Sequence, residues 1–194
     1  MKFEIYNYET VTSTNDVALN FIKNKNILNG CIQADFQTKG KGTQGKEWIS
    51  KKGNLFATVF FKLKDNFPPF NEFALINPVI ISNVIKNLCN EHKISVKWPN
   101  DIFFNGKKVC GILQELITHK NSQFLVIGIG INIDSNPNIN NKYRATNIFD
   151  ETKKKINVMK LINLIISSYE KFFSNLEAYN YKNYKKEAET IALG

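Results

Sequence analysis

The order of hydrophobic and polar residues predicts a first helix close to the start of the chain. The motif Ser13–Asp16 is typical of a helix start, because Ser or Thr can cap the first turn and an acidic side chain suits its positive end. Apolar residues then recur at helical spacing as far as Ile22. We expect this helix to end near 29–30, where Asn is followed by Gly.

Three later segments also have helical periodicity. Residues 71–92 place apolar side chains at every third or fourth position, and Pro78 either kinks this helix or marks its first turn. Residues 158–178 alternate apolar and polar faces, as expected of a helix with one buried stripe. The segment 180–193 is predicted to be helical as well.

The remaining apolar runs are short and predict strands. We expect strands at 31–36, 54–63, 94–98, 101–104, 107–113, 116–118 and 124–133. The run 54–63 is apolar on both faces, which indicates burial within a sheet. Asn105-Gly106 predicts a tight hairpin, and a polar turn at 119–123 predicts a second one. With irregular segments at 37–53 and 134–156, the sum is an α+β fold: a mixed, mostly antiparallel sheet packed against helices on one side.

Length and composition place the chain among ordinary globular proteins. The 194 residues are 43% hydrophobic and 22% charged, which excludes a disordered tail, a fibre and a disulfide miniprotein. No repeat or linker divides the chain, so we predict a single domain over 1–194. The start lacks the apolar stretch of an export signal, and no apolar run approaches the roughly 20 residues of a membrane helix. We therefore expect no membrane partner.

Charge and metal-binding residue types narrow the function less sharply. The net charge of +9 suits polyanions such as nucleic acids or phosphate-bearing ligands, although a lysine-rich composition explains it equally well, since Arg144 is the only arginine. The cysteines and histidines are widely spaced (Cys31, Cys89, Cys110, His92 and His119). This spacing indicates neither a zinc site nor a disulfide framework, so we expect a reduced, cytoplasmic protein.

The loop 37–48, QTKGKGTQGKEW, carries the strongest chemical signal. Its glycines let backbone amides approach a ligand closely, and its three lysines add positive charge beside them. This combination suits a phosphate or a carboxylate. The loop contains no Walker motif, and its GxGxxG pattern precedes a strand rather than a helix, which argues against a dinucleotide fingerprint. Glycine spacing alone is equally compatible with a flexible basic surface loop.

Two further stretches combine polar and apolar residues in unusual ways. In 97–101, KWPND, the lysine could neutralise a phosphate and Asp101 could hold Mg²⁺, while the alternative is an ordinary surface turn. In 128–132, GIGIN, alternating glycines leave room for a flat group or another backbone, and Asn132 could contact a base edge. The alternative there is tight packing beneath a helix.

Taken together, these motifs follow one another in a recognisable order. They are Ser13-Thr14-Asn15, the glycine-rich loop that ends at Trp48, KWPND, Lys108 with Gly111-Ile112-Leu113-x-Glu115, and GIGIN. In this order the chain resembles the catalytic domain of biotin protein ligases, also called biotin–[acetyl-CoA carboxylase] ligases, over roughly residues 5–178. The resemblance implies the fold of class II aminoacyl-tRNA synthetase catalytic domains. It also leads us to expect no N-terminal winged helix, and a C-terminal SH3-like domain that is absent or truncated.

The resemblance further implies a two-step reaction. Biotin and ATP would give biotinyl-5′-AMP and pyrophosphate with Mg²⁺ present, and biotin would then pass to one lysine of a biotin carboxyl carrier protein. The expected partner is the carrier of acetyl-CoA carboxylase, and a homodimer is compatible with the family. No nucleic-acid partner is expected, because arginine is nearly absent and the lysines are dispersed.

The resemblance also assigns roles to individual residues. The biotin-binding set is Ser13, Thr14, Asn15, Gln37, Lys41, Gly42, Thr43, Lys108, Gly111 and Leu113. The ATP-binding set is Lys46, Trp48, Lys97, Asn100 and Asn132. The catalytic set is Lys108, Lys41 and Asp101, with Asp101 also a candidate contact to Mg²⁺ through the phosphates and a candidate base for the transfer step. Thr43 departs from the pattern, because many relatives have arginine there.

Two other functions remain as alternatives. A lipoate or octanoate ligase shares the implied fold, although KWPND and the glycine-rich loop favour biotin. A nucleic-acid-binding module would account for the net charge, but it would require arginine-rich stripes or exposed aromatic platforms that the chain lacks.

Overall fold

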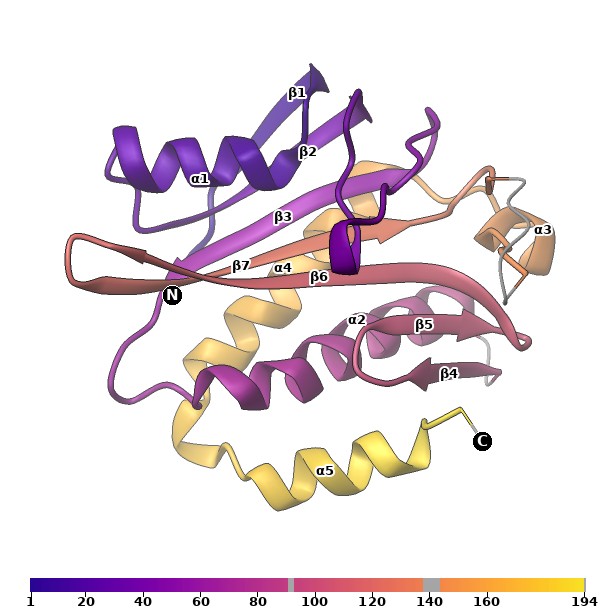
Figure 1. Ribbon diagram of the computed structural model, residues 1–194. Helices are drawn as coiled ribbons and strands as arrows, with labels where there is room; N and C mark the ends of the chain where they lie inside the picture. Colours follow the sequence, from indigo (N-terminus) through magenta and orange to yellow (C-terminus); the bar gives the residue numbers. More distant parts are fainter. Residues whose placement is uncertain (91–92, 138–143, 194) are drawn as a thin grey trace.

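The computed structural model describes residues 1–90, 93–137 and 144–193, and within them seven strands form one sheet. The strand order is β1-β2-β3-β7-β6-β5-β4; β1 and β2 run parallel and the other neighbours antiparallel (Figure 1). The strands are β1 (Ile5–Val11), β2 (Asn29–Gln37), β3 (Leu55–Lys62), β4 (Ile94–Lys97), β5 (Asp101–Phe104), β6 (Lys107–His119) and β7 (Ser122–Ile131). The helices are α1 (Thr14–Asn24), α2 (Phe73–Cys89), α3 (Ile148–Thr152), α4 (Val158–Ser174) and α5 (Tyr181–Thr190). The predicted mixed, mostly antiparallel α+β sheet is confirmed.

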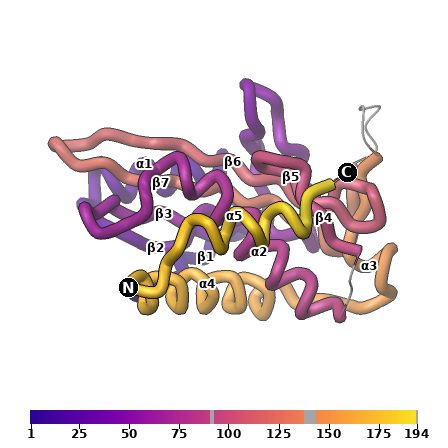
Figure 2. Tube along the Cα trace, turned by 90° about the horizontal axis from the view of Figure 1, so that it is seen from below, coloured from indigo at the N-terminus to yellow at the C-terminus, as the bar shows by residue number. Residues whose placement is uncertain are grey.

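Helices cover both faces of the sheet, so the expectation of helices on one side is wrong. Alternate residues of a strand point to opposite faces, and Phe61 packs in the cluster with α2 and α4 whereas Phe60 packs against α1. Helix α1 lies on that second face (Figure 1), and it buries Phe21 and Ile22 there. Figure 2 shows α2, α4 and α5 together on the opposite side.

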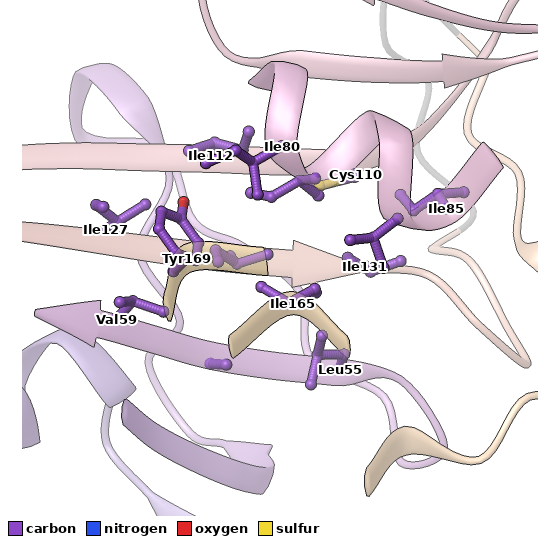
Figure 3. Close-up of a cluster of buried hydrophobic side chains, with 14 of the residues drawn as sticks. Leu55, Val59, Ile80, Ile85, Cys110, Ile112, Ile127, Ile131, Ile165 and Tyr169 are labelled. Carbon is purple, nitrogen blue, oxygen red and sulfur yellow. The ribbon is translucent and has the colours of Figure 1, made fainter. Parts of the chain in front are cut away.

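The larger core lies between the sheet and the pair α2 and α4 (Figure 3). Within it, Tyr169 donates a 3.0 Å hydrogen bond to Asn77 Oδ1, and Asn77 Nδ2 donates to Gln114 Oε1 at 2.8 Å. Burial raises the pKa of Tyr169, which keeps this hydroxyl protonated as a donor. Pro78 follows Asn77 and lies beyond the first turn of α2, so the first-turn alternative is wrong. This polar chain ties both helices to β6.

Several element boundaries differ from the predicted ones. Helix α1 ends at Asn24 instead of near 29–30, because Asn26 adopts a left-handed φ of 53° and β2 already begins at Asn29. The two strands predicted within 107–118 form one continuous strand, β6. The Asn105-Gly106 hairpin is confirmed, with φ values of 50° and 73°.

Two elements were not predicted at all. Strand β1 mixes tyrosines with polar residues at the edge of the sheet, and α3 is a short helix whose start is capped by Asn147. The rest of the predicted irregular segment 134–156 lies partly outside the described residues, and so does His92. Among the described residues, none of the helices has both the length and the apolar character needed to span a bilayer.

Candidate functional site

A cavity opens on the face of the sheet that α1 covers. The glycines of β6 and β7 have no side chains to fill the space there. The volume of the cavity is about 440 Å³ when counted out to its mouth. The predicted residues that line it are Ser13, Thr14, Asn15, Gln37, Lys41, Gly42, Thr43, Trp48, Asn100, Asp101, Lys108, Gly111 and Leu113. Ala57, Ile112, Gly128, Ile129 and Gly130 complete the lining. Residues from six separate stretches of sequence therefore meet around one space, while their individual roles remain predictions.

One wall of the cavity is a buried polar row at the start of α1. Ser13 occupies the N-cap position but makes no side-chain capping bond, which corrects the expected Ser or Thr cap. Gln37, at the end of β2, takes over this task, because its Oε1 accepts from the Thr14 backbone N–H at 2.8 Å. The Thr14 hydroxyl lies 3.1 Å from the same oxygen. The helix start and the strand end are thus held together by the polar side chains that border the cavity.

Two residues that the sequence did not single out for the site lie behind this row. The Thr58 hydroxyl donates to Asn15 Oδ1 at 2.6 Å, and Asn15 Nδ2 donates to Glu115 Oε2 at 2.6 Å. Thr58 is the one hydroxyl-bearing residue of the apolar strand β3, and this interruption of an apolar run was the available signal. Glu115 was part of one of the sequence motifs, but the sequence had assigned no role to it.

The opposite wall is the indole of Trp48, which lies flat on two glycines. A Cβ atom on Gly111 would meet Trp48 Cζ3 at 2.6 Å, and one on Gly130 would meet Cζ2 at 2.7 Å. The room predicted above 128–132 is therefore filled by a flat group of the protein itself. Trp48 Nε1 is buried without a hydrogen-bond partner. This indole N–H is therefore a free donor on a side chain that lines the cavity.

The charged end of the cavity is an ion pair between Lys108 and Asp101. Lys108 Nζ lies 2.7 Å from Asp101 Oδ1 and 5.6 Å from the Trp48 ring centre. Asp101 Oδ1 is buried but accepts no well-aligned hydrogen bond, so charge rather than direction holds the pair. The amine can consequently turn toward an incoming anion without breaking a directed bond.

The backbone of Lys108 is fixed by a segment distant in sequence. Lys108 N–H donates to Arg144 O at 2.9 Å, and Thr146 N–H donates to Lys108 O at 2.9 Å. Glu151 anchors this segment by accepting from Thr146 at 2.6 Å and from Lys107 at 2.9 Å. Burial alone would raise the pKa of Glu151, but these bonds and one from the Asn105 side chain outweigh it and lower the pKa.

The remaining predicted residues do not border this cavity. Lys46 lines a neighbouring cavity of about 1070 Å³, counted out to its mouth in the same way, that shares Lys41 with the first. Lys97 lies opposite Asp101 in the β4–β5 register, and Asn132 donates to Thr146 O at 3.0 Å. In the part of the chain that the structure describes, no group of three His, Cys, Asp or Glu side chains could hold a metal ion.

Known proteins resemble this chain in sequence and in fold. Residues 8–132 match the Biotin/lipoate A/B protein ligase family. The Bifunctional ligase/repressor BirA of Bacillus subtilis is 28% identical over 193 residues, which are 96% of this chain and 59% of that protein. The protein of the same name from Escherichia coli is 34% identical over 126 residues, 63% of this chain and 38% of its own length. The chain thus spans about three fifths or less of these relatives.

Solved structures agree with the sequence matches. A biotin protein ligase from Aquifex aeolicus in complex with biotin and ATP superposes with a TM-score of 0.82 at 27% identity, covering 98% of this chain and 78% of that one. A biotin protein ligase from Leishmania major in complex with biotin gives 0.84 at 28% identity, covering 98% and 81%. The family match spans more than half of the chain, and the chain therefore belongs to the biotin/lipoate A/B protein ligase family.

Proposed function

We propose that the chain is the catalytic unit of an ATP-dependent biotin–protein ligase. The observation that carries this proposal is the two-ended cavity: buried neutral donors and acceptors at α1 face a cation, Lys108, at the other end. A cyclic urea needs neutral hydrogen-bonding partners, whereas a carboxylate and a phosphate need positive charge. Biotin has a cyclic urea at one end and a carboxylate at the other. The similar proteins named above are biotin ligases, which favours biotin over lipoate.

In the first step a biotin carboxylate oxygen attacks the α-phosphorus of ATP, and the bond to the β-phosphate breaks to release pyrophosphate. Because the carboxylate is itself the nucleophile, the protein has to supply charge neutralisation and alignment. Lys108 is the residue for this role, with Lys41 from the glycine-rich loop beside it. Ser13, Thr14, Asn15 and Gln37 would hold the ureido ring, and Trp48 would shelter the adenine.

In the second step the amine of a carrier lysine attacks the acyl carbon of the adenylate. The bond to AMP breaks, an amide forms and the amine gives up a proton. Asp101 is a candidate acceptor of that proton, and its Oδ1 lies 2.7 Å from Lys108 Nζ. The carrier of acetyl-CoA carboxylase is the proposed partner, and a homodimer and a cytoplasmic location remain predictions.

Magnesium would enter this site with ATP. Mg²⁺ is commonly held by substrate phosphates together with one or two carboxylates. Asp101 is the carboxylate available at the charged end, and the absence of a three-ligand cluster in the described ranges fits an ion held mainly by phosphates. The magnesium ion would neutralise phosphate charge, and Lys108 would still align the biotin carboxylate.

The test is mass spectrometry of a purified biotin carboxyl carrier domain after incubation with this protein, biotin and MgATP. We expect a mass increase of one biotinyl group on a single lysine, and none when ATP is left out. Exchange of labelled pyrophosphate into ATP, compared with biotin or lipoate as the acid, separates the two members of the family. Exchange that depends on lipoate and not on biotin would contradict the proposal.

A further inference from the structure

A continuous chain of hydrogen bonds runs behind the polar wall of the cavity. It starts at Glu115 and passes through Asn15 and Thr58 to Thr14 and Gln37. The contacts are 2.6 Å from Asn15 to Glu115, 2.6 Å from Thr58 to Asn15, 2.8 Å between the Thr58 and Thr14 hydroxyls, and 3.1 Å between the Thr14 hydroxyl and Gln37 Oε1. Thr58 is fully buried, and Asn15 and Thr14 are each 3% exposed. Solvent therefore cannot replace the partners in the middle of the chain, whereas Glu115 is partly exposed where it borders the neighbouring cavity.

At both ends of this chain of hydrogen bonds, the donor and the acceptor are fixed. The Glu115 carboxylate is an acceptor, so it requires the amide nitrogen of Asn15 and turns Asn15 Oδ1 toward Thr58. Gln37 Oε1 is required as an acceptor by the Thr14 backbone N–H at 2.8 Å, a donor that cannot change. The hydroxyls of Thr58 and Thr14 therefore lie between two amide carbonyl oxygens, Asn15 Oδ1 at one end and Gln37 Oε1 at the other.

The two threonine hydroxyls have two protons for three oxygen–oxygen contacts. The 2.6 Å contact between Thr58 and Asn15 requires a proton, since two oxygen atoms without one repel at that distance. The Thr58 hydroxyl also lies 2.8 Å from Thr14 Oγ1 as the donor, and the Thr14 proton serves the 3.1 Å contact to Gln37 Oε1. Thr14 thus gives its proton to Gln37 and keeps one lone pair, and because it lines the cavity it meets a ligand as an acceptor.

The position of Asn15 is also fixed from below. A Cβ atom on Gly128 would lie 2.5 Å from Asn15 Oδ1, so the amide rests directly on the backbone of β7. The position of the Asn15 side chain is therefore fixed, and only the orientation of its amide remains to be determined, that is, which amide atom points to Glu115 and which to Thr58. The charge on Glu115 determines this orientation.

We propose that Glu115 is a positioning residue, with Thr58 as its relay, that orients Asn15 and makes Thr14 a hydrogen-bond acceptor for the ligand. The inference rests on the proposed function, in which this wall binds the ureido group of biotin. A ureido N–H is a donor and needs an acceptor. Glu115 acts through Asn15 and does not itself line this cavity.

The experiment is a double-mutant cycle on biotin binding by calorimetry, with Glu115→Gln, Asn15→Asp and the two combined. Glu115→Gln should weaken binding about tenfold, because a neutral amide can accept or donate and no longer fixes Asn15. Asn15→Asp alone places two carboxylates in contact and should bind less tightly still. In the combined variant the new amide donates to the new carboxylate, which still accepts from Thr58, so binding should recover about tenfold relative to Asn15→Asp.

Two further variants and one control complete the design. Thr58→Val removes the relay hydroxyl at constant volume and should weaken biotin binding as much as Glu115→Gln does. Thr58→Ser keeps the hydroxyl and should bind biotin as tightly as wild type. Glu9→Gln changes the net charge equally on the exposed edge strand β1 and should bind as wild type. For Glu115→Gln we expect a higher biotin KM in pyrophosphate exchange with kcat within about twofold, since orientation alone is affected.

The outcomes separate the inference from the function on which it rests. Wild-type protein that binds no biotin would overturn the proposed function. Wild-type binding with an unchanged Glu115→Gln variant, or with no recovery in the folded combined variant, would overturn the positioning role alone. Loss of binding in Thr58→Ser as large as in Thr58→Val would also overturn it, because packing and not the hydroxyl would then be responsible.

Discussion

Replacing Lys108 with alanine should nearly abolish the activation of biotin. The amine lies at the charged end of the cavity, 2.7 Å from Asp101 Oδ1, and the two side chains are 30% and 19% exposed. Its backbone is fixed on both sides by the hydrogen bonds to residues 144 and 146. In the proposed reaction this cation would neutralise the charge that develops as the carboxylate attacks the α-phosphate, and alanine would leave that charge facing the Asp101 carboxylate.

The size of the effect follows from the electrostatics of a half-buried site. Two unit charges about 4 Å apart interact by roughly 4 kcal/mol at an effective dielectric of 20. Since part of this is offset by solvent, about 3 kcal/mol of transition-state stabilisation should be lost, which is a rate decrease of about 100-fold or more. Stability should change much less, because the Lys108–Asp101 pair is partly exposed.

The assay is biotin-dependent exchange of labelled pyrophosphate into ATP, and Lys107→Ala is the matched control. Lys107 is the preceding residue of the same strand, but its amine lies 2.9 Å from Glu151 instead and its side chain is 45% exposed. This variant loses the same charge and should keep exchange within about threefold of wild type. Exchange by Lys108→Ala within about fivefold of wild type, with the variant folded, would refute the assigned role.

Two further predictions concern the glycine-rich loop and an acidic anchor. Trypsin should cleave residues 38–50 at Lys41 or Lys46 more slowly once biotin and MgATP are added, because an anion relieves the repulsion between these lysines; equal cleavage rates would contradict this. Because the pKa of Glu151 is lowered from its ordinary value of 4.5, its stabilising effect is present above that value and lost as the pH falls below it. The melting temperature of wild type should therefore fall more steeply on acidification than that of Glu151→Gln, and parallel curves would count against the anchor.

The sequence predicted those parts of the fold that depend on local patterns. The apolar run of β3 and the Asn105-Gly106 hairpin are examples, because burial and turn geometry are decided within a few residues. The face of the sheet that α1 covers was not predictable in this way. It depends on which alternate residues of β2, β3 and β7 remain uncovered by α2 and α4, and that is a property of the assembled sheet.

The candidate site shows the same division between motif and tertiary contact. Residues in motifs, such as Gln37 and Lys108, could be predicted for the site because the motifs resemble those of a family, and both line the cavity. Thr58 and Glu115 were not assigned to the site, because their contacts to Asn15 join positions 43 and 100 residues apart. The glycines of 128–132 were understood only in part, since Asn15 lies on Gly128 and Trp48 on Gly130, and both are residues of the chain itself rather than a ligand.

Thr43 is the position at which this chain should differ most from relatives that carry arginine there. Thr43 lines the cavity at the start of a short 3-10 turn, Thr43–Gly45, but a threonine cannot reach a phosphate or offer a fork of donors. The two neighbours that could compensate are less well placed: Lys41 pairs with Asp16 on α1, and Gln44 borders the neighbouring cavity rather than this one. The loop should therefore hold biotinyl-adenylate less firmly than a loop with arginine.

Thr43→Arg tests this reasoning directly. The new guanidinium should slow dissociation of preformed adenylate about tenfold, the effect of one regained charge-assisted hydrogen bond of about 1.5 kcal/mol. Thr43→Ser, which changes neither charge nor reach, should release adenylate at the wild-type rate. The rates are measured by chasing labelled adenylate with excess unlabelled adenylate. An unchanged rate in a folded Thr43→Arg variant would mean that Lys41 exchanges Asp16 for the phosphate at little cost, because its ion pair is exposed on both sides and easily broken.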